Sequence, residues 1–189
     1  MRGVITATAL GICVLGTGAC VTSAAYKNKV EATHPPIGRP VSVGTETVHV
    51  IQRGEAGPPV LMIHGASANA REFTWTLAPR LEGAYRVLMA DRPGHGYSSR
   101  PEDAQDLGVQ ATQMAGVLDQ LAPDEKAILV GHSFGGAVAL RVALDRPELV
   151  KGLVLLAPLA VTWWVFSWLV ARVGGSFRPL ISVFLPDFL

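Results

Sequence analysis

The chain has 189 residues, of which 49% are hydrophobic and 16% charged, and its formal net charge is +1. That length supports one domain with a substantial core, and the near-neutral balance excludes the basic surface typical of nucleic-acid-binding proteins. No spacing of cysteine or histidine matches a metal site, and Cys13 and Cys20 do not form a disulfide framework for the rest of the chain. Neither a metal nor another cofactor is therefore expected.

The first 26 residues differ in character from the rest, because no charged residue lies between Arg2 and Lys27. This pattern indicates a signal peptide or a membrane anchor. Three versions stay open: cleavage after Ala25, lipid attachment at Cys20 as in a lipoprotein, and an uncleaved membrane span. The sequence thus predicts an exported or membrane-anchored protein of the cell envelope. Residues 27–40 are predicted to be a linker, and its part from residue 31 to residue 40, which contains three prolines, is predicted to be extended.

A domain of alternating strands and helices is predicted from residue 41 to residue 158. Residues 41–54 alternate in polarity and indicate a strand pair with a turn near Gly44. The apolar run at residues 58–63 predicts a buried strand. The segment from Asn69, a plausible cap, to Gly83 is predicted to be one helix.

The same alternation continues further along the chain. Residues 85–90 predict another buried strand, and the apolar stripe from Leu107 to Leu121 has helical period. A strand at residues 126–132 is followed by a helix that Pro147 ends, and then by a strand at residues 150–157. This order predicts an α/β fold with a mostly parallel sheet and helices on both faces.

The last segment, residues 159–189, is predicted to be the start of a lid or cap. Residues 152–171 carry no charge and could by hydropathy span a membrane. Because Pro158 interrupts this run, we interpret it as a strand followed by an aromatic lid segment. The strand at residues 150–157 is then expected to have an open edge.

The motif G-H-S-F-G, from Gly131 to Gly135, places Ser133 between two glycines, directly after a buried strand and before a helix. A nucleophile elbow requires this context. The turn is sharp enough to strain the backbone of the serine, and the glycines leave room where side chains would collide. The sequence therefore predicts that Ser133 is a nucleophile.

Three motifs in this order resemble the N-terminal part of the α/β-hydrolase superfamily: HGAS at residues 64–67, DRPGHGYS at residues 91–98 and GHSFGG at residues 131–136. The resemblance implies an incomplete α/β-hydrolase fold, truncated at the start of the cap. It also implies an oxyanion hole formed by the backbone N–H groups of Ala66 and Phe134. The other residues expected in the loops of the site are His64, Gly65, Gly131 and Gly135, with His64 holding its loop rather than carrying a proton.

The acid and the histidine of the triad are not found in this chain. The family order is serine, acid, histidine, and no histidine follows Ser133. We therefore expect the chain to be the N-terminal portion of a serine hydrolase that cleaves ester or related acyl bonds and is inactive by itself. A missing C-terminal half is the expected partner, and a small apolar ester or acyl compound the expected substrate.

Three alternatives stay open at this stage. The chain could be a non-catalytic remnant or binding subunit of the same fold. It could also be related to cofactor-free haloperoxidases or to C–C bond hydrolases, since both classes share these motifs.

Overall fold

The computed structural model describes residues 22, 25–26, 28–157 and 182–184, divided into two compact units, Met1–Ile37 and Gly38–Leu189. The charge-free N-terminal segment therefore lies almost wholly outside the described residues, as does most of the predicted lid. Within the part that is described, no helix combines the length and the apolar character needed to cross a membrane.

The predicted linker is only partly extended. Residues 28–33 are helical, and the His34 amide donates to the Val30 carbonyl oxygen at 2.8 Å. The prediction of an extended conformation is wrong for residues 31–33, because the prolines come only later: Pro35 and Pro36 lie after the last helical turn and end it.

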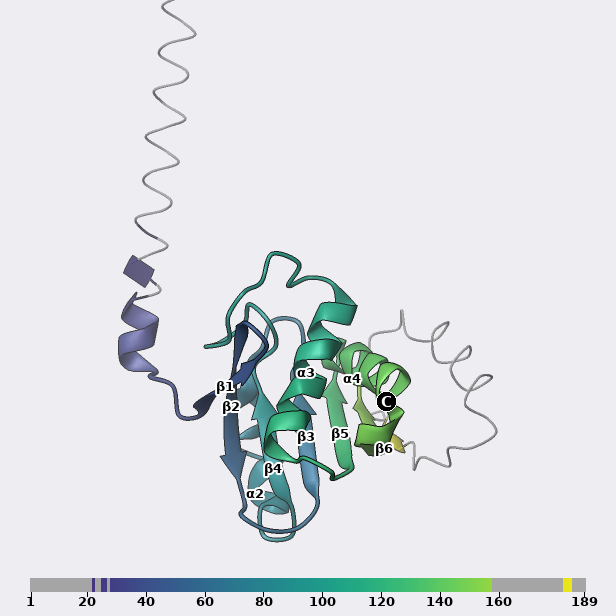
Figure 1. Cartoon of the computed structure of the whole chain (residues 1–189). Helices are drawn as coiled ribbons and strands as arrows, with labels where there is room; N and C mark the ends of the chain where they lie inside the picture. Colours follow the sequence, from purple (N-terminus) through teal and green to yellow (C-terminus); the bar gives the residue numbers. More distant parts are fainter. Residues whose placement is uncertain (1–21, 23–24, 27, 158–181, 185–189) are drawn as a thin grey trace, which may run out of the picture. The chain divides into compact units, whose positions relative to one another are not determined.

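The second unit contains a mixed sheet, shown in Figure 1, whose strand order is β1-β2-β4-β3-β5-β6-β7. Its strands β3 to β7 run parallel to one another, while β1 and β2 are antiparallel to their neighbours. The strands are β1 (Arg39–Val43), β2 (Glu46–Arg53), β3 (Pro59–Ile63), β4 (Arg86–Ala90), β5 (Ala127–His132), β6 (Val150–Leu156) and β7 (Ser182–Phe184). The predicted turn at Gly44 joins β1 to β2 and has a φ of 60°.

Helices cover both faces of the sheet, as the sequence predicts. The helical elements are η1 (Ala70–Phe73), α2 (Ala78–Leu81), α3 (Leu107–Leu121), α4 (Phe134–Asp145) and η2 (Pro147–Leu149). In β3, Leu61 and Ile63 belong to the core cluster that includes α3 and α4, whereas Val60 and Met62 belong to the cluster that includes η1 and the start of α2. Since side chains alternate along a strand, β3 is buried on both sides.

Two expectations need correction. The single helix predicted for residues 69–83 consists of two short pieces, η1 and α2, separated by a turn. Pro79 accounts for part of this break, because proline has no amide hydrogen to continue a helix that began at Asn69. The strand β6 does not have an open edge over its whole length, since β7 pairs with Val154–Leu156.

Candidate active site

The nucleophile elbow is present at Ser133, between the end of β5 and the start of α4. Ser133 has φ 50° and ψ −116°, a conformation that costs a non-glycine residue free energy and that clusters at functional sites. Its amide donates to the Leu156 carbonyl oxygen at 2.9 Å, which ties the elbow to β6. A side chain at Gly131 would lie 2.5 Å from the Gly135 carbonyl oxygen, so the turn closes only with glycine there.

The loops after β3 and β5 meet at one edge of the sheet because these strands are parallel neighbours. The loop after β3 places Gly65 against the elbow: a Cβ at Gly65 would lie 3.3 Å from the Cβ of Ser133. In the described part of the chain, neither the Ala66 amide nor the Phe134 amide donates a hydrogen bond. Both amides are therefore available to bind an oxygen that develops negative charge.

His64 is fully buried and neutral. Its Nε2 accepts from the Arg92 amide at 3.0 Å, so its Nδ1 carries the hydrogen and donates to the Gly65 carbonyl oxygen at 2.8 Å. Burial lowers the pKa of His64 from 6.5 to about 4, even though the hydrogen bond to Gly65 opposes this shift. With both ring nitrogens engaged, His64 joins the loops after β3 and β4.

The lowered pKa of His64 predicts a pH dependence of stability. Folding disfavours the protonated imidazole, so its contribution is fully present above about pH 6.5 and is lost as the pH falls towards 4. Between pH 7.5 and 4.5 we expect a loss of about 2 to 3 kcal/mol in the free energy of unfolding from this group. Urea unfolding of the wild type and of His64→Gln measures it, since only the wild type carries this proton-linked term. Equal pH slopes for the two proteins would contradict the assignment.

The remaining histidines have other contacts. His49, in β2, bonds to Asp91 through Nδ1 at 2.8 Å, and His95 lies in the turn after β4 with Nε2 3.0 Å from the Ala66 carbonyl oxygen. The ring of His132 lies against the carboxylate of Glu72. Among the described residues, no histidine side chain is hydrogen-bonded to the hydroxyl of Ser133.

Comparison with known proteins agrees with this geometry. Residues 58–178 match a family described as the alpha/beta hydrolase fold. The chain belongs to the α/β-hydrolase family. Its relatives include the 2-hydroxymuconate semialdehyde hydrolase of Pseudomonas sp. (strain CF600), 37% identical over 161 residues, which cover 81% of this chain and 56% of the relative. The chain thus spans little more than half the length of this relative.

Solved structures of α/β-hydrolases are similar over the same region. A meta-cleavage product hydrolase from Pseudomonas fluorescens IP01 superimposes with a TM-score of 0.59 and 32% identity, covering 65% of this chain and 46% of that chain. An esterase from Exiguobacterium antarcticum gives a TM-score of 0.59 and 30% identity, with the same coverage. The family relatives are hydrolases, and the incomplete coverage fits the partial fold predicted from the sequence.

In this α/β-hydrolase, Asp91 organises the turn after β4. Its carboxylate accepts from His49 Nδ1, from the Ala70 amide at 2.7 Å and from the Tyr97 amide at 3.0 Å. Burial raises the pKa of Asp91, but these hydrogen bonds outweigh burial and hold the pKa below its usual value. Gly96, with a φ of 51°, packs so closely on this carboxylate that a Cβ would overlap it. The turn is therefore rigid.

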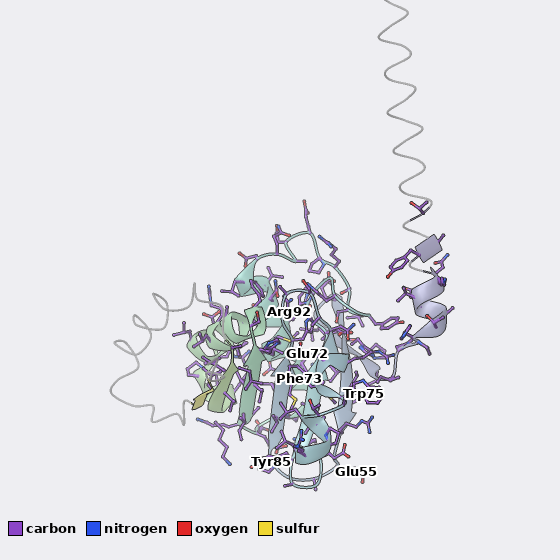
Figure 2. All side chains as sticks on the ribbon, turned by 180° about the vertical axis from the view of Figure 1, so that it is seen from behind. Glu55, Glu72, Phe73, Trp75, Tyr85 and Arg92 are labelled. Carbon is purple, nitrogen blue, oxygen red and sulfur yellow. The ribbon has the colours of Figure 1, made fainter. Side chains whose placement is uncertain are left out.

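Two charged residues of the hydrolase site were not predicted from the sequence. Glu72, on η1, accepts from the Gly65 amide at 3.2 Å and contacts His132, the residue before the nucleophile. Arg92 is 2% exposed and donates to the carbonyl oxygens of His64 and Gly65. Figure 2 labels both side chains: Glu72 lies on η1, and Arg92 lies in the loop after β4. A single charge carries no periodic signal, on a short helix such as η1 or in a loop, so no sequence pattern identified either residue.

A pocket of about 310 Å³ adjoins the two free amides. Most of its exposed lining is apolar, although polar residues also contribute: it is bordered by Ala66, Pro93, Gly94, Ala104 and Phe134 and by Arg92, His95, Arg100, Gln105 and Gln110. The pocket is open to solvent at Arg100, which is exposed. The pocket therefore offers a mostly apolar surface, and the polar groups of Arg92 and Gln110 on its wall are already hydrogen-bonded to each other.

Proposed function

We propose that Ser133 is the nucleophile of a serine hydrolase that cleaves ester or related acyl bonds. The observation that carries this proposal is the strained elbow, with Ser133 at φ 50° and the free amides of Ala66 and Phe134 beside it. The Ser133 Oγ would attack the acyl carbon and form a new C–O bond, while the electron pair of the carbonyl moves onto its oxygen. The two amides would stabilise that negative charge.

A base must take the proton of Ser133 during this attack. Since no histidine follows Ser133 in the sequence, we propose that the base and the acid that orients it come from a polypeptide segment outside these 189 residues. The substrate is proposed to be a small ester or acyl compound. The mostly apolar lining of the adjoining pocket favours one with an apolar part.

Cleavage of a carbon–carbon bond next to a ketone is the second candidate. It is favoured by relatives named as hydrolases of 2-hydroxymuconate semialdehyde and of meta-cleavage products. The oxyanion hole would serve both reactions, because both place negative charge on a carbonyl oxygen. The assay needs a product of this gene that also carries the acid and the histidine. If that product turns over 2-hydroxymuconate semialdehyde but not p-nitrophenyl acetate, carbon–carbon bond cleavage is favoured over ester hydrolysis.

Labelling with a fluorophosphonate tests whether Ser133 is a nucleophile. We expect the 189-residue chain to be labelled slowly, because the amides of Ala66 and Phe134 are available to act as an oxyanion hole and no base contacts Ser133 among the described residues. Tandem mass spectrometry should find the phosphonyl group on Ser133, and Ser133→Ala should remain unlabelled. A folded wild-type chain without any label would instead support a non-catalytic protein of this fold.

A further inference from the structure

Among the described residues, no carboxylate hydrogen-bonds to the buried guanidinium of Arg92, and the carboxylate of Glu72 acts on it only through its charge. Arg92 Nε donates to the His64 carbonyl oxygen at 3.0 Å, its Nη1 to Gln110 Oε1 at 2.7 Å and its Nη2 to the Gly65 carbonyl oxygen at 2.8 Å, while His95 Nε2 lies 3.3 Å from Nη2. Burial lowers the pKa of Arg92 to about 10, which leaves the guanidinium charged at neutral pH. A charge is costly to bury, and in proteins it is usually paired. The burial of the Arg92 guanidinium therefore needs a physical explanation.

The contact with Gly65 acts directly on one oxyanion donor. The carbonyl group of Gly65 and the N–H of Ala66 belong to the same planar peptide unit and point in opposite directions. This carbonyl oxygen accepts a long hydrogen bond of 3.4 Å from the Ala68 amide and two shorter ones, from Arg92 Nη2 and from His64 Nδ1, each of 2.8 Å. Both shorter bonds fix the direction of the Ala66 N–H, and they polarise the peptide so that this N–H becomes a stronger donor.

The same guanidinium also contacts the residue that supplies the second donor. Arg92 Cζ lies 4.9 Å from the ring centroid of Phe134, within the range of a cation–π interaction. Phe134 follows Ser133 directly and begins α4. One side chain from the loop after β4 thus contacts both halves of the oxyanion hole, which come from the loops after β3 and β5.

We propose that Arg92 is the positioning residue of the oxyanion hole: it orients the Gly65–Ala66 peptide and the Phe134 side chain, and it places a fixed positive charge beside the oxygen that becomes negative in the transition state. This inference rests on the proposed function of Ser133. It explains why the guanidinium donates to the carbonyl oxygens of His64 and Gly65, while the carboxylate of Glu72 acts on it only through its charge. Gln110, on α3, satisfies the guanidinium without adding charge.

The test compares Arg92→Met, Arg92→Lys and Phe134→Leu with Arg141→Met, an exposed arginine on α4 that pairs with Asp145. The labelling rate of each 189-residue variant is measured over a range of fluorophosphonate concentrations. This series gives a maximal rate and the concentration at which half of that rate is reached. Loss of one oxyanion-hole donor lowers rates by about 10²- to 10³-fold. We expect the maximal rate to fall by about 10- to 100-fold in Arg92→Met, with the half-saturating concentration nearly unchanged.

The other variants separate positioning from charge. Arg92→Lys keeps the charge but cannot donate to three acceptors at once, so an intermediate rate is expected. Phe134→Leu retains the amide and removes only the ring, so a loss of several-fold is expected. Arg141→Met should label like the wild type. If folded Arg92→Lys and Phe134→Leu both label at the wild-type rate, the proposal is overturned, even where Arg92→Met does not fold.

A second measurement does not depend on labelling. The amide proton of Ala66 should shift upfield in the NMR spectrum of Arg92→Met, because the Gly65 carbonyl loses a charged donor, whereas Arg141→Met should leave it unchanged. An unshifted Ala66 amide contradicts the proposal. If instead the wild type labels at a residue other than Ser133, the proposed function fails, and this shift still decides whether Arg92 orients the peptide.

Discussion

Replacing Ser133 by alanine is expected to reduce ester hydrolysis by about 10⁴- to 10⁶-fold in any product of this gene that also carries the acid and the histidine. The physical reason is that alanine has no oxygen to form the acyl intermediate, while the oxyanion hole and the binding pocket are left intact. Those parts alone give only a small residual rate. Initial rates with p-nitrophenyl acetate measure the effect.

Ser133→Cys serves as a matched control for this change, because it keeps a nucleophile in the same strained turn. Thermal unfolding followed by circular dichroism should show that Ser133→Ala is folded, and its melting temperature should be no lower than that of the wild type, since the strain at φ 50° is unchanged. Near-wild-type turnover in folded Ser133→Ala would show that another residue is the nucleophile.

Replacing Gly135 by alanine is expected to destabilise the fold strongly although it adds only one methyl group. A Cβ at Gly135 would overlap the carbonyl oxygen of Ile63 and would lie 2.6 Å from that of His64. These oxygens are backbone atoms at the end of the central strand β3, so they cannot rotate away as a side chain would. Either α4 moves off the sheet or the end of β3 shifts, and we expect a loss of about 3 kcal/mol or more in the free energy of unfolding.

Gly152→Ala, in β6, is the matched control, because its added Cβ meets no heavy atom within 4 Å and its φ is not positive. Urea unfolding should place Gly152→Ala close to the wild type and Gly135→Ala far below it. The rate of fluorophosphonate labelling gives a second measurement. If Gly135→Ala is still folded, it should be labelled more slowly than the wild type, because a displaced α4 moves the Phe134 amide. Equal stability of the two variants would show that α4 does not pack on β3 as described.

Much of the fold could be predicted from the sequence because its signals are local. An apolar run such as residues 59–63 identifies a strand that is buried on both faces, and the spacing from Leu107 to Leu121 identifies a helix. The elbow is also a local signal, because two glycines that flank Ser133 between a strand and a helix leave few possible conformations for the turn. The family followed from three such local motifs.

Other features depend on partners far away in the sequence. The segment from Asn69 to Gly83 had the caps of one helix, but a helix through Pro79 would have lost an internal hydrogen bond. The pairing of β7 with β6 joins residues about 28 positions apart, from Val154 to Ser182, and no property of residues 182–184 alone predicts which strand they meet.

The roles of Glu72 and Arg92 show the same limit within the site. In the sequence they are ordinary surface charges, seven and twenty-seven residues from Gly65. Only the tertiary structure brings them to the same loop, because the parallel order of β4, β3 and β5 places three loops at one edge of the sheet. The sequence by itself determined which residue, Ser133, adopts the strained backbone conformation of a nucleophile elbow. The tertiary structure decided which side chains hold the groups around it, since burial and hydrogen bonding depend on distances in space and not on separation along the chain.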